Sequence, residues 1–144
     1  MRKDWKRWFL NKVENTKDSD FYDLEDRKYQ FINLYKDEVP FHKELQNYIF
    51  SLNPSQEQTD YEVYHIHTWN EGDFFSEHID NNFKRRWSYI CELQSSQCGT
   101  SLLVEGNPLK EGLFDSETKH EVPQIQKGTR ISLTVFGSLP NTLI

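Results

Sequence analysis

Apolar residues recur at helical spacing in two stretches of the first third of the chain. The first stripe consists of Trp5, Trp8, Phe9 and Val13, and the second of Leu45, Tyr48, Ile49 and Leu52. Residues three to four positions apart share one face of a helix. The stripes therefore predict a helix over residues 1–16 and a second helix that begins at Pro40 and ends before Pro54. Both stripes are expected to pack against a core.

Apolar and polar residues alternate along much of the remaining chain, which is typical of strands. Strands are predicted over residues 29–35, 61–69, 74–80, 87–93, 98–104, 112–114 and 130–136. Loops are predicted over residues 51–60 and 105–110, and a strand or short helix begins at Phe21. Short strands separated by turn residues predict a sandwich or barrel. The expected fold class is α+β and mainly β.

One short motif, His78-Ile79-Asp80, carries the most specific chemistry in the chain. Side chains two positions apart on extended chain point to the same side, so an imidazole nitrogen and a carboxylate oxygen would face one metal ion. A second histidine would complete a facial triad, which leaves open metal positions and suits non-haem Fe(II). His120 is the candidate for that third ligand.

Arg130 is the only arginine in the final third of the chain, and it opens the apolar strand 130–136 after a Gly-Thr pair. A guanidinium at the edge of a β-sandwich interior needs an anion, because an unpaired buried charge is costly. A carboxylate matches the guanidinium with two bonds at once. Arg130 is therefore a candidate anchor for a carboxylate ligand.

Composition and charge narrow the class of protein. The length of 144 residues corresponds to one domain, and the net charge of -6 argues against nucleic acid as a partner. No apolar run of about 18 residues exists, so no membrane span is expected. The basic start lacks the apolar segment of a secretory signal, which favours a cytoplasmic location. Cys91 and Cys98 are then expected to be reduced, with a facing pair across a hairpin as the alternative.

The ordered motifs resemble those of the Fe(II)/2-oxoglutarate-dependent oxygenase superfamily, within it the prolyl 4-hydroxylase-like branch. The matching positions are Trp69-Asn70-Glu71-Gly72, His78-Ile79-Asp80, His120 and Arg130. The resemblance implies a double-stranded β-helix, or jelly roll, with N-terminal helices packed on one sheet. It implies a single oxygenase domain over residues 1–144, with helical N-terminal support over 1–55 and a jelly-roll core containing the metal site over 61–136.

Carried over to this sequence, the resemblance assigns His78, Asp80 and His120 to Fe(II) and Arg130 to the distal carboxylate of the cosubstrate 2-oxoglutarate. O2 would take the remaining metal position. The implied reaction releases succinate and CO2 and hydroxylates a C–H bond, and a prolyl residue in a peptide or protein is the favoured target. The alternatives are the same chemistry on a free amino acid, a small metabolite or a nucleobase, and a non-catalytic metal-binding jelly-roll module.

Two positions beside the expected cosubstrate site depart from the family pattern. Trp69 stands where relatives have a tyrosine that contacts 2-oxoglutarate, and His67 on the same face of the strand is a candidate for a second contact. Glu92 precedes Leu93 where relatives often carry a tyrosine. A glutamate beside the cosubstrate carboxylate would repel it, so either Glu92 faces elsewhere or the strand register differs.

The remaining polar motifs are more simply explained by structure than by chemistry. The basic run Lys84–Arg86 is favoured as a solvated turn, and the alternative places it at the mouth of the site against an acidic or extended substrate. His42 and His65 are interpreted as structural. No pattern sets the oligomeric state.

Overall fold

The computed structural model describes residues 1–52, 59–80 and 85–138, in which two α-helices accompany ten strands. In chain order the elements are α1 (Lys3–Asn15), β1 (Asp20–Leu24), β2 (Arg27–Tyr35), the 3-10 helix η1 (Lys36–Glu38), α2 (His42–Leu52), β3 (Asp60–Trp69), β4 (Phe74–His78), β5 (Arg85–Gln94), β6 (Leu102–Val104), β7 (Asn107–Leu109), β8 (Glu111–Asp115), β9 (His120–Val122) and β10 (Arg130–Ser138). Neither helix has the length and apolar character needed to cross a membrane.

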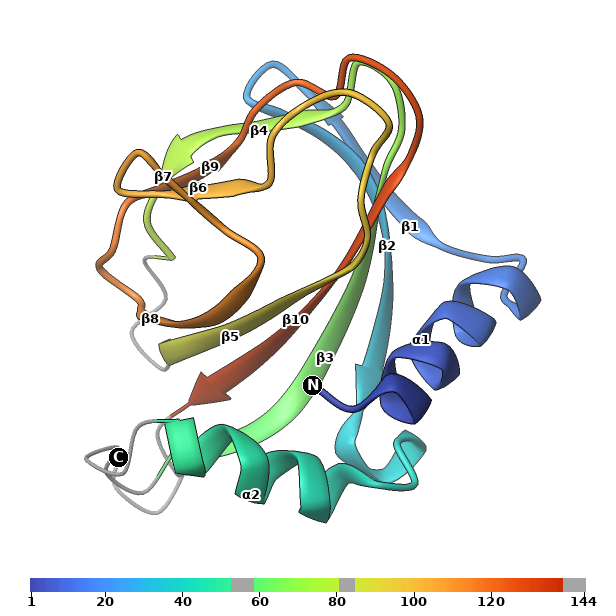
Figure 1. Ribbon diagram of the computed structural model, residues 1–144, viewed down its shortest axis with the longest axis vertical. Helices are drawn as coiled ribbons and strands as arrows, with labels where there is room; N and C mark the ends of the chain where they lie inside the picture. The colour runs from blue at the N-terminus through green and yellow to red at the C-terminus, as the bar shows by residue number, and fades with distance from the viewer. Residues whose placement is uncertain (53–58, 81–84, 139–144) are drawn as a thin grey trace.

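The ten strands form one antiparallel sheet that rolls into a nearly closed barrel (Figure 1). Its order is β7-β6-β9-β4-β2-β3-β10-β5-β8, with β1 paired to the outside of β2. β2 pairs with β3 along much of its length, but with β4 only through Arg27 and Lys28. This partial pairing divides the sheet into a large wall of β2, β3, β10, β5 and β8 and a small wall of β4, β9, β6 and β7. The mainly β jelly-roll fold expected from the sequence is confirmed.

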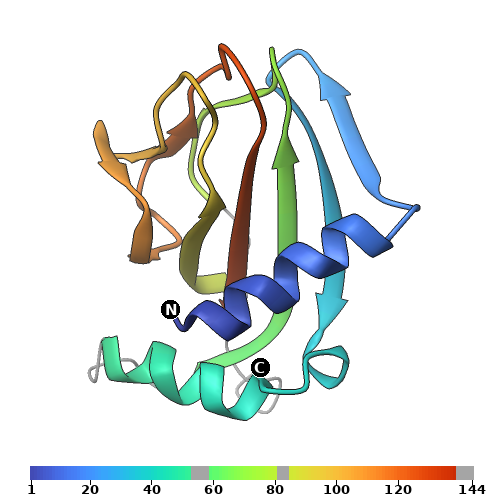
Figure 2. The same ribbon diagram turned by 45° about the vertical axis from the view of Figure 1, so that its right-hand side comes forward.

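Alternation along β10 separates a structural face of the large wall from a pocket face. Ile131, Leu133 and Val135 are buried in the core cluster that also contains residues of both helices. Figure 2 shows α1 lying across this outer face of β3 and β10, with α2 below it at the lower ends of these strands. The intervening residues Arg130 and Ser132 point into the space between the walls. The helices thus fix the wall on which half of the candidate site is built.

Several elements differ from the expected ones. The N-terminal segment contains the two expected helices, but it also supplies β1 and the central strand β2. The strand expected at 98–104 is shortened to β6, and residues 107–109 in the expected loop form β7. Glu105 (φ 49) and Gly106 (φ 80) make the tight left-handed turn that joins these two strands. Part of the loop predicted over 51–60 lies outside the described residues.

The two cysteines are free thiols in different environments. Cys91 is buried in the core beneath the helices, whereas Cys98 is exposed. The alternative of a pair facing each other across a hairpin is therefore not realised. Burial raises the pKa of the Cys91 thiol to about 11, which keeps it protonated and unreactive at neutral pH.

Candidate functional site

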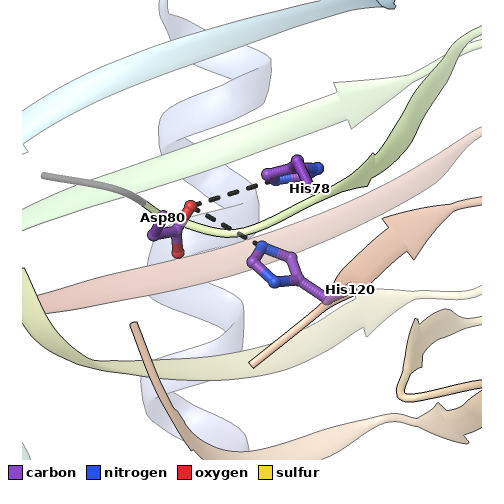
Figure 3. A group of neighbouring side chains, drawn as sticks. All are labelled: His78, Asp80 and His120. Atoms are coloured by element: carbon purple, nitrogen blue, oxygen red, sulfur yellow. Dashed lines mark ion pairs between the residues drawn. The ribbon is translucent and has the colours of Figure 1, made fainter. Parts of the chain in front are cut away.

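His78, Asp80 and His120 meet at the end of the small wall (Figure 3). His78 ends β4 and His120 opens β9, and the two are direct cross-strand partners. One ligand atom from each of the three residues lies within 4.8 Å of the others. Asp80 Oδ1 is 3.9 Å from His78 Nε2 and 3.6 Å from His120 Nε2. The three side chains thus present two nitrogens and one oxygen toward a common point.

Hydrogen bonds fix which atoms of the triad face that point. His78 Nδ1 lies 2.6 Å from the carbonyl oxygen of Ser76, and His120 Nδ1 lies 2.9 Å from that of Thr118. A carbonyl only accepts, so each Nδ1 is the donor, and each ring offers the lone pair of Nε2 when that nitrogen carries no proton. Asp80 Oδ2 accepts a hydrogen bond from Ser88 Oγ at 3.2 Å, which leaves Oδ1 for a ligand. Such supporting contacts are typical of metal sites.

The charges of the triad suit a cation. Burial lowers the pKa of His78, which keeps its ring neutral near pH 7. Burial alone would raise the pKa of Asp80 and lower that of His120, but the contact between the two outweighs it and shifts both pKa values the other way. Asp80 is therefore ionised at neutral pH, as a metal-binding carboxylate must be.

Arg130 lies on the opposite wall of the same pocket and is only 2% exposed. Its Nε donates to Glu92 Oε1 at 2.8 Å, and its Nη1 is buried without a hydrogen-bond partner among the described residues. Of the two alternatives stated for Glu92, the one in which it faces elsewhere is wrong, because it contacts Arg130. A β-bulge between Ile131 and Ser132 makes Glu92 the cross-strand partner of Ser132, which brings it to the pocket face beside Arg130. One nitrogen of Arg130 is thus already paired, while another is available.

Trp69 and His67 lie on β3 directly beside Arg130 and Ser132, because the register pairs Trp69 with Arg130 and His67 with Ser132. Trp69 Nε1 donates to Ser132 Oγ at 3.1 Å. The one donor of the indole is therefore used, and the Ser132 hydroxyl keeps its own proton for a ligand. His67 is buried, which holds its pKa well below the usual value and its ring neutral.

Tyr29 is the central pocket residue that sequence reasoning missed. Its ring centroid lies 4.5 Å from that of Trp69, 5.2 Å from that of His67 and 5.6 Å from that of Phe75. It comes from β2, and no local motif signals that this N-terminal strand enters the sheet beside β3. Burial raises the pKa of Tyr29 to about 12, so its hydroxyl stays protonated.

The sequence indicates the other pocket residues with different strength. Ser132 could have been found, since it lies two positions after Arg130 on a predicted strand. Arg27 and Arg85 also line the pocket, but no local sequence pattern indicates that they do. Arg85 thus supports the alternative placement of the basic run at the mouth; Lys84 lies outside the described residues.

The two histidines that were interpreted as structural lie in different places. His42 Nδ1 bonds the hydroxyl of Tyr64 at 2.5 Å on the helix side of the sheet, which agrees with a structural role. His65 instead lines the pocket between the rings of Phe31 and Phe136. Burial lowers the pKa of His65 to about 4, so it faces the pocket as a neutral ring.

Comparison with known proteins finds likeness in structure but not in sequence. No protein-family model matches the chain, and no curated protein matches it. A prolyl-4-hydroxylase from Pseudomonas putida is similar with a TM-score of 0.67 at 18% identity, over 98% of this chain and 89% of that one. A viral collagen prolyl hydroxylase from Paramecium bursaria Chlorella virus-1 has a TM-score of 0.73 at 13% identity, over 97% and 92%.

A third similar structure is an oxidoreductase of the 2OG-Fe(II) oxygenase family from Burkholderia pseudomallei. Its TM-score is 0.68 at 14% identity, over 94% of this chain and 79% of that one. At such identities the likeness establishes a shared fold. The resemblance first stated from the motifs is therefore confirmed at the level of the fold, because solved structures of the same enzyme group share it.

Proposed function

We propose that this protein is an Fe(II)- and 2-oxoglutarate-dependent dioxygenase that hydroxylates a C–H bond. One observation carries the proposal. The pocket that holds the His78–Asp80–His120 triad on one wall also holds, on the other wall, a buried arginine with one nitrogen that has no partner among the described residues. A metal with open positions and an anchor for a carboxylate are the two elements that such a reaction requires.

The residues fit both absent groups. Two imidazole nitrogens and one carboxylate oxygen, gathered within 4.8 Å, are the donor set of non-haem Fe(II) oxygenases. Nη1 of Arg130 is a buried donor without a partner in the described part of the chain, and a buried unpaired donor costs about 1–3 kcal/mol. A carboxylate of 2-oxoglutarate would satisfy it.

Bound iron, with 2-oxoglutarate and O2, would supply the oxidising chemistry. The chain's own residues bind and orient these groups. His78 and His120 would hold the metal through Nε2 and Asp80 through Oδ1, while Arg130 and the hydroxyl of Ser132 would hold the cosubstrate carboxylate. Trp69 would act through Ser132, because its hydrogen bond turns the serine proton toward the pocket.

We further propose that residues 1–144 act as one oxygenase domain and that a prolyl residue of a peptide is the favoured target. Two of the similar structures are described as prolyl hydroxylases, which supports this choice over a small metabolite or a nucleobase. A non-catalytic metal-binding module is disfavoured by Arg130, since a purely structural metal needs no buried carboxylate anchor.

The decisive experiment is succinate release by purified protein supplied with Fe(II), ascorbate and 2-oxoglutarate. We expect slow release without substrate and faster release with proline-containing peptides, and a mass increase of one oxygen atom on the peptide. Asp80→Ala should lose both iron binding and turnover. Protein that binds iron but never 2-oxoglutarate would support the non-catalytic module instead.

A further inference from the structure

Two arginines line the pocket outside the groups assigned above. Arg27 opens β2 and Arg85 opens β5, so they reach the pocket from different parts of the large wall. Neither is needed to hold metal or cosubstrate. Their place beside a reaction centre has a cost, because a guanidinium that leaves water requires an anion or another compensating contact.

Arg27 is fixed between two aromatic rings close to the metal ligands. Its guanidinium carbon lies 4.6 Å from the ring centroid of Tyr22 and 5.1 Å from that of Phe75. The Phe75 ring stacks on the His78 ring with 3.6 Å between centroids. Nε of Arg27 is buried without a hydrogen-bond partner among the described residues, and it lies 3.6 Å from the carboxylate of Asp26, whose side chain is 58% exposed to water. This cation is positioned by its neighbours but incompletely paired.

Arg85 is held in a similar manner on the other side. Its guanidinium carbon lies 3.8 Å above the ring centroid of Phe136, a contact that orients a cation without neutralising it. The side chain of Arg85 forms no hydrogen bond or ion pair with another residue in the described part of the chain. Arg85 and Asp80 line the same pocket, and the charge of Asp80 partly offsets the lowering of the Arg85 pKa by burial.

The charges of the pocket indicate what is missing. Arg130 is neutralised by Glu92, and under the proposed function the two charges of Fe(II) offset those of 2-oxoglutarate. Arg27 and Arg85 then stand against Asp80 and against Asp26, whose carboxylate lies 3.6 Å from Arg27 but is 58% exposed. Because water screens such an exposed pair, the loaded pocket keeps an excess of positive charge, which matches a carboxylate. A phosphate monoester would bring nearly two negative charges and leave the pocket negative.

We propose that Arg27 and Arg85 bind a carboxylate of the substrate, so that the oxidised C–H bond belongs to a residue that carries a free carboxylate. This inference rests on the proposed function and narrows its substrate. The carboxylate can belong to a free or N-acylated amino acid or to the C-terminal residue of a peptide, since both offer the same group. A residue inside a long chain, with its carboxyl in an amide bond, lacks it.

The test measures binding to protein loaded with Mn(II) and saturating 2-oxoglutarate, which occupies Arg130. Calorimetry compares each common amino acid as the N-acetyl acid and as the N-acetyl amide, together with proline-ending tripeptides in both forms. We expect at least one acid to bind tenfold or more tightly than its amide. The tripeptides and the N-acetyl amino acids separate the two sources of the carboxylate. Equal binding of every acid and amide, or no binding by any, overturns the proposal.

Variants identify the residues responsible. Arg27→Gln and Arg85→Gln should reduce the preference for the acid to less than about threefold, while Arg85→Lys should retain part of it. Arg86→Gln is the matched control, because Arg86 is the exposed neighbour of Arg85 on β5 and the change removes the same charge. If Arg86→Gln lowers the preference as much as Arg85→Gln, the effect is one of general charge and the proposal fails.

Binding of Mn(II) and 2-oxoglutarate is measured first in every variant. If the unmodified protein binds neither Mn(II) nor 2-oxoglutarate, the proposed function itself is refuted. Intact binding of both, without a preference for acids, would refute only the carboxylate inference.

Discussion

At the scale of single residues, Arg130 is already paired before any ligand binds, because its Nε donates to Glu92 Oε1 at 2.8 Å. The consequence is a proposed cosubstrate anchor whose charge is already offset. This pairing depends on a bulge between neighbouring strands, which no local pattern reports. His78 and Asp80, in contrast, were identifiable from the sequence because alternation along a strand is a local rule, and the structure brings both together with His120.

We predict that Glu92→Gln binds 2-oxoglutarate about tenfold more tightly, which corresponds to about 1.4 kcal/mol. The amide oxygen can still accept from Arg130 Nε, but the negative charge beside the incoming carboxylate is gone. Calorimetry with Mn(II)-loaded protein measures the Kd. Glu117→Gln, on the exposed surface, is the control for a charge change alone. Weaker binding would mean that the ion pair itself orients Arg130.

A second prediction concerns Ser88, which donates a hydrogen bond to Asp80 Oδ2. Ser88→Ala should weaken Mn(II) binding by about 10- to 100-fold, because groups that orient a ligand typically contribute that much to metal affinity. Titration of Mn(II) followed by electron paramagnetic resonance gives the affinity. Ser96→Ala, which removes a half-buried hydroxyl that donates to the carbonyl oxygen of Cys98, should leave it unchanged. Equal affinities for both variants would show that Asp80 needs no orienting partner.

At the scale of elements, strands with strong alternation were predicted well and short ones poorly. β3 and β10 stood out because one face packs on the helices and the other lines the pocket. β7 and β9 have three residues each, too few for a period to emerge. β2 was recognised as a strand, yet its place between β3 and β4 is a long-range pairing, and so Tyr29 and Arg27 were missed.

The contact between β10 and β3 predicts the effect of a change at Gly137. A Cβ at this position would lie 2.5 Å from Thr59 Cγ2 and 2.7 Å from the ring of Tyr61, so Gly137→Ala forces the strands apart. We expect a loss of about 1–3 kcal/mol in the free energy of unfolding, measured by urea denaturation. At Gly112 the tightest contact is the flexible end of Leu109, so Gly112→Ala should cost clearly less. Equal losses would contradict this account of the strand contact.

At the scale of the whole molecule, the site is divided between the two walls of the roll. The metal triad belongs to the small wall, through β4 and β9, whereas Arg130 and Ser132 belong to β10 of the large wall. The walls are joined at β2, which pairs with β4 through only two residues. This division was not predictable from the sequence, because the motifs order the residues along the chain without assigning them to walls. A ligand that contacts both walls should therefore tie them together.

We accordingly predict that Mn(II) and 2-oxoglutarate stabilise the fold in a fixed order. Mn(II) at 100 times its Kd should add about 2.7 kcal/mol to the free energy of unfolding, and 2-oxoglutarate should add a further increment only when the metal is present. Thermal unfolding measures both steps, and hydrogen exchange should show that the second step protects amides of β9 and β10 together.

Arg130→Gln separates the two contributions. It should keep the stabilisation by Mn(II), since the triad lies on the other wall, and should lose most of the increment from 2-oxoglutarate. If the variant keeps the full increment, the cosubstrate is held by the small wall alone. The buried nitrogen of Arg130 would then have a purpose other than bridging the two halves of the roll.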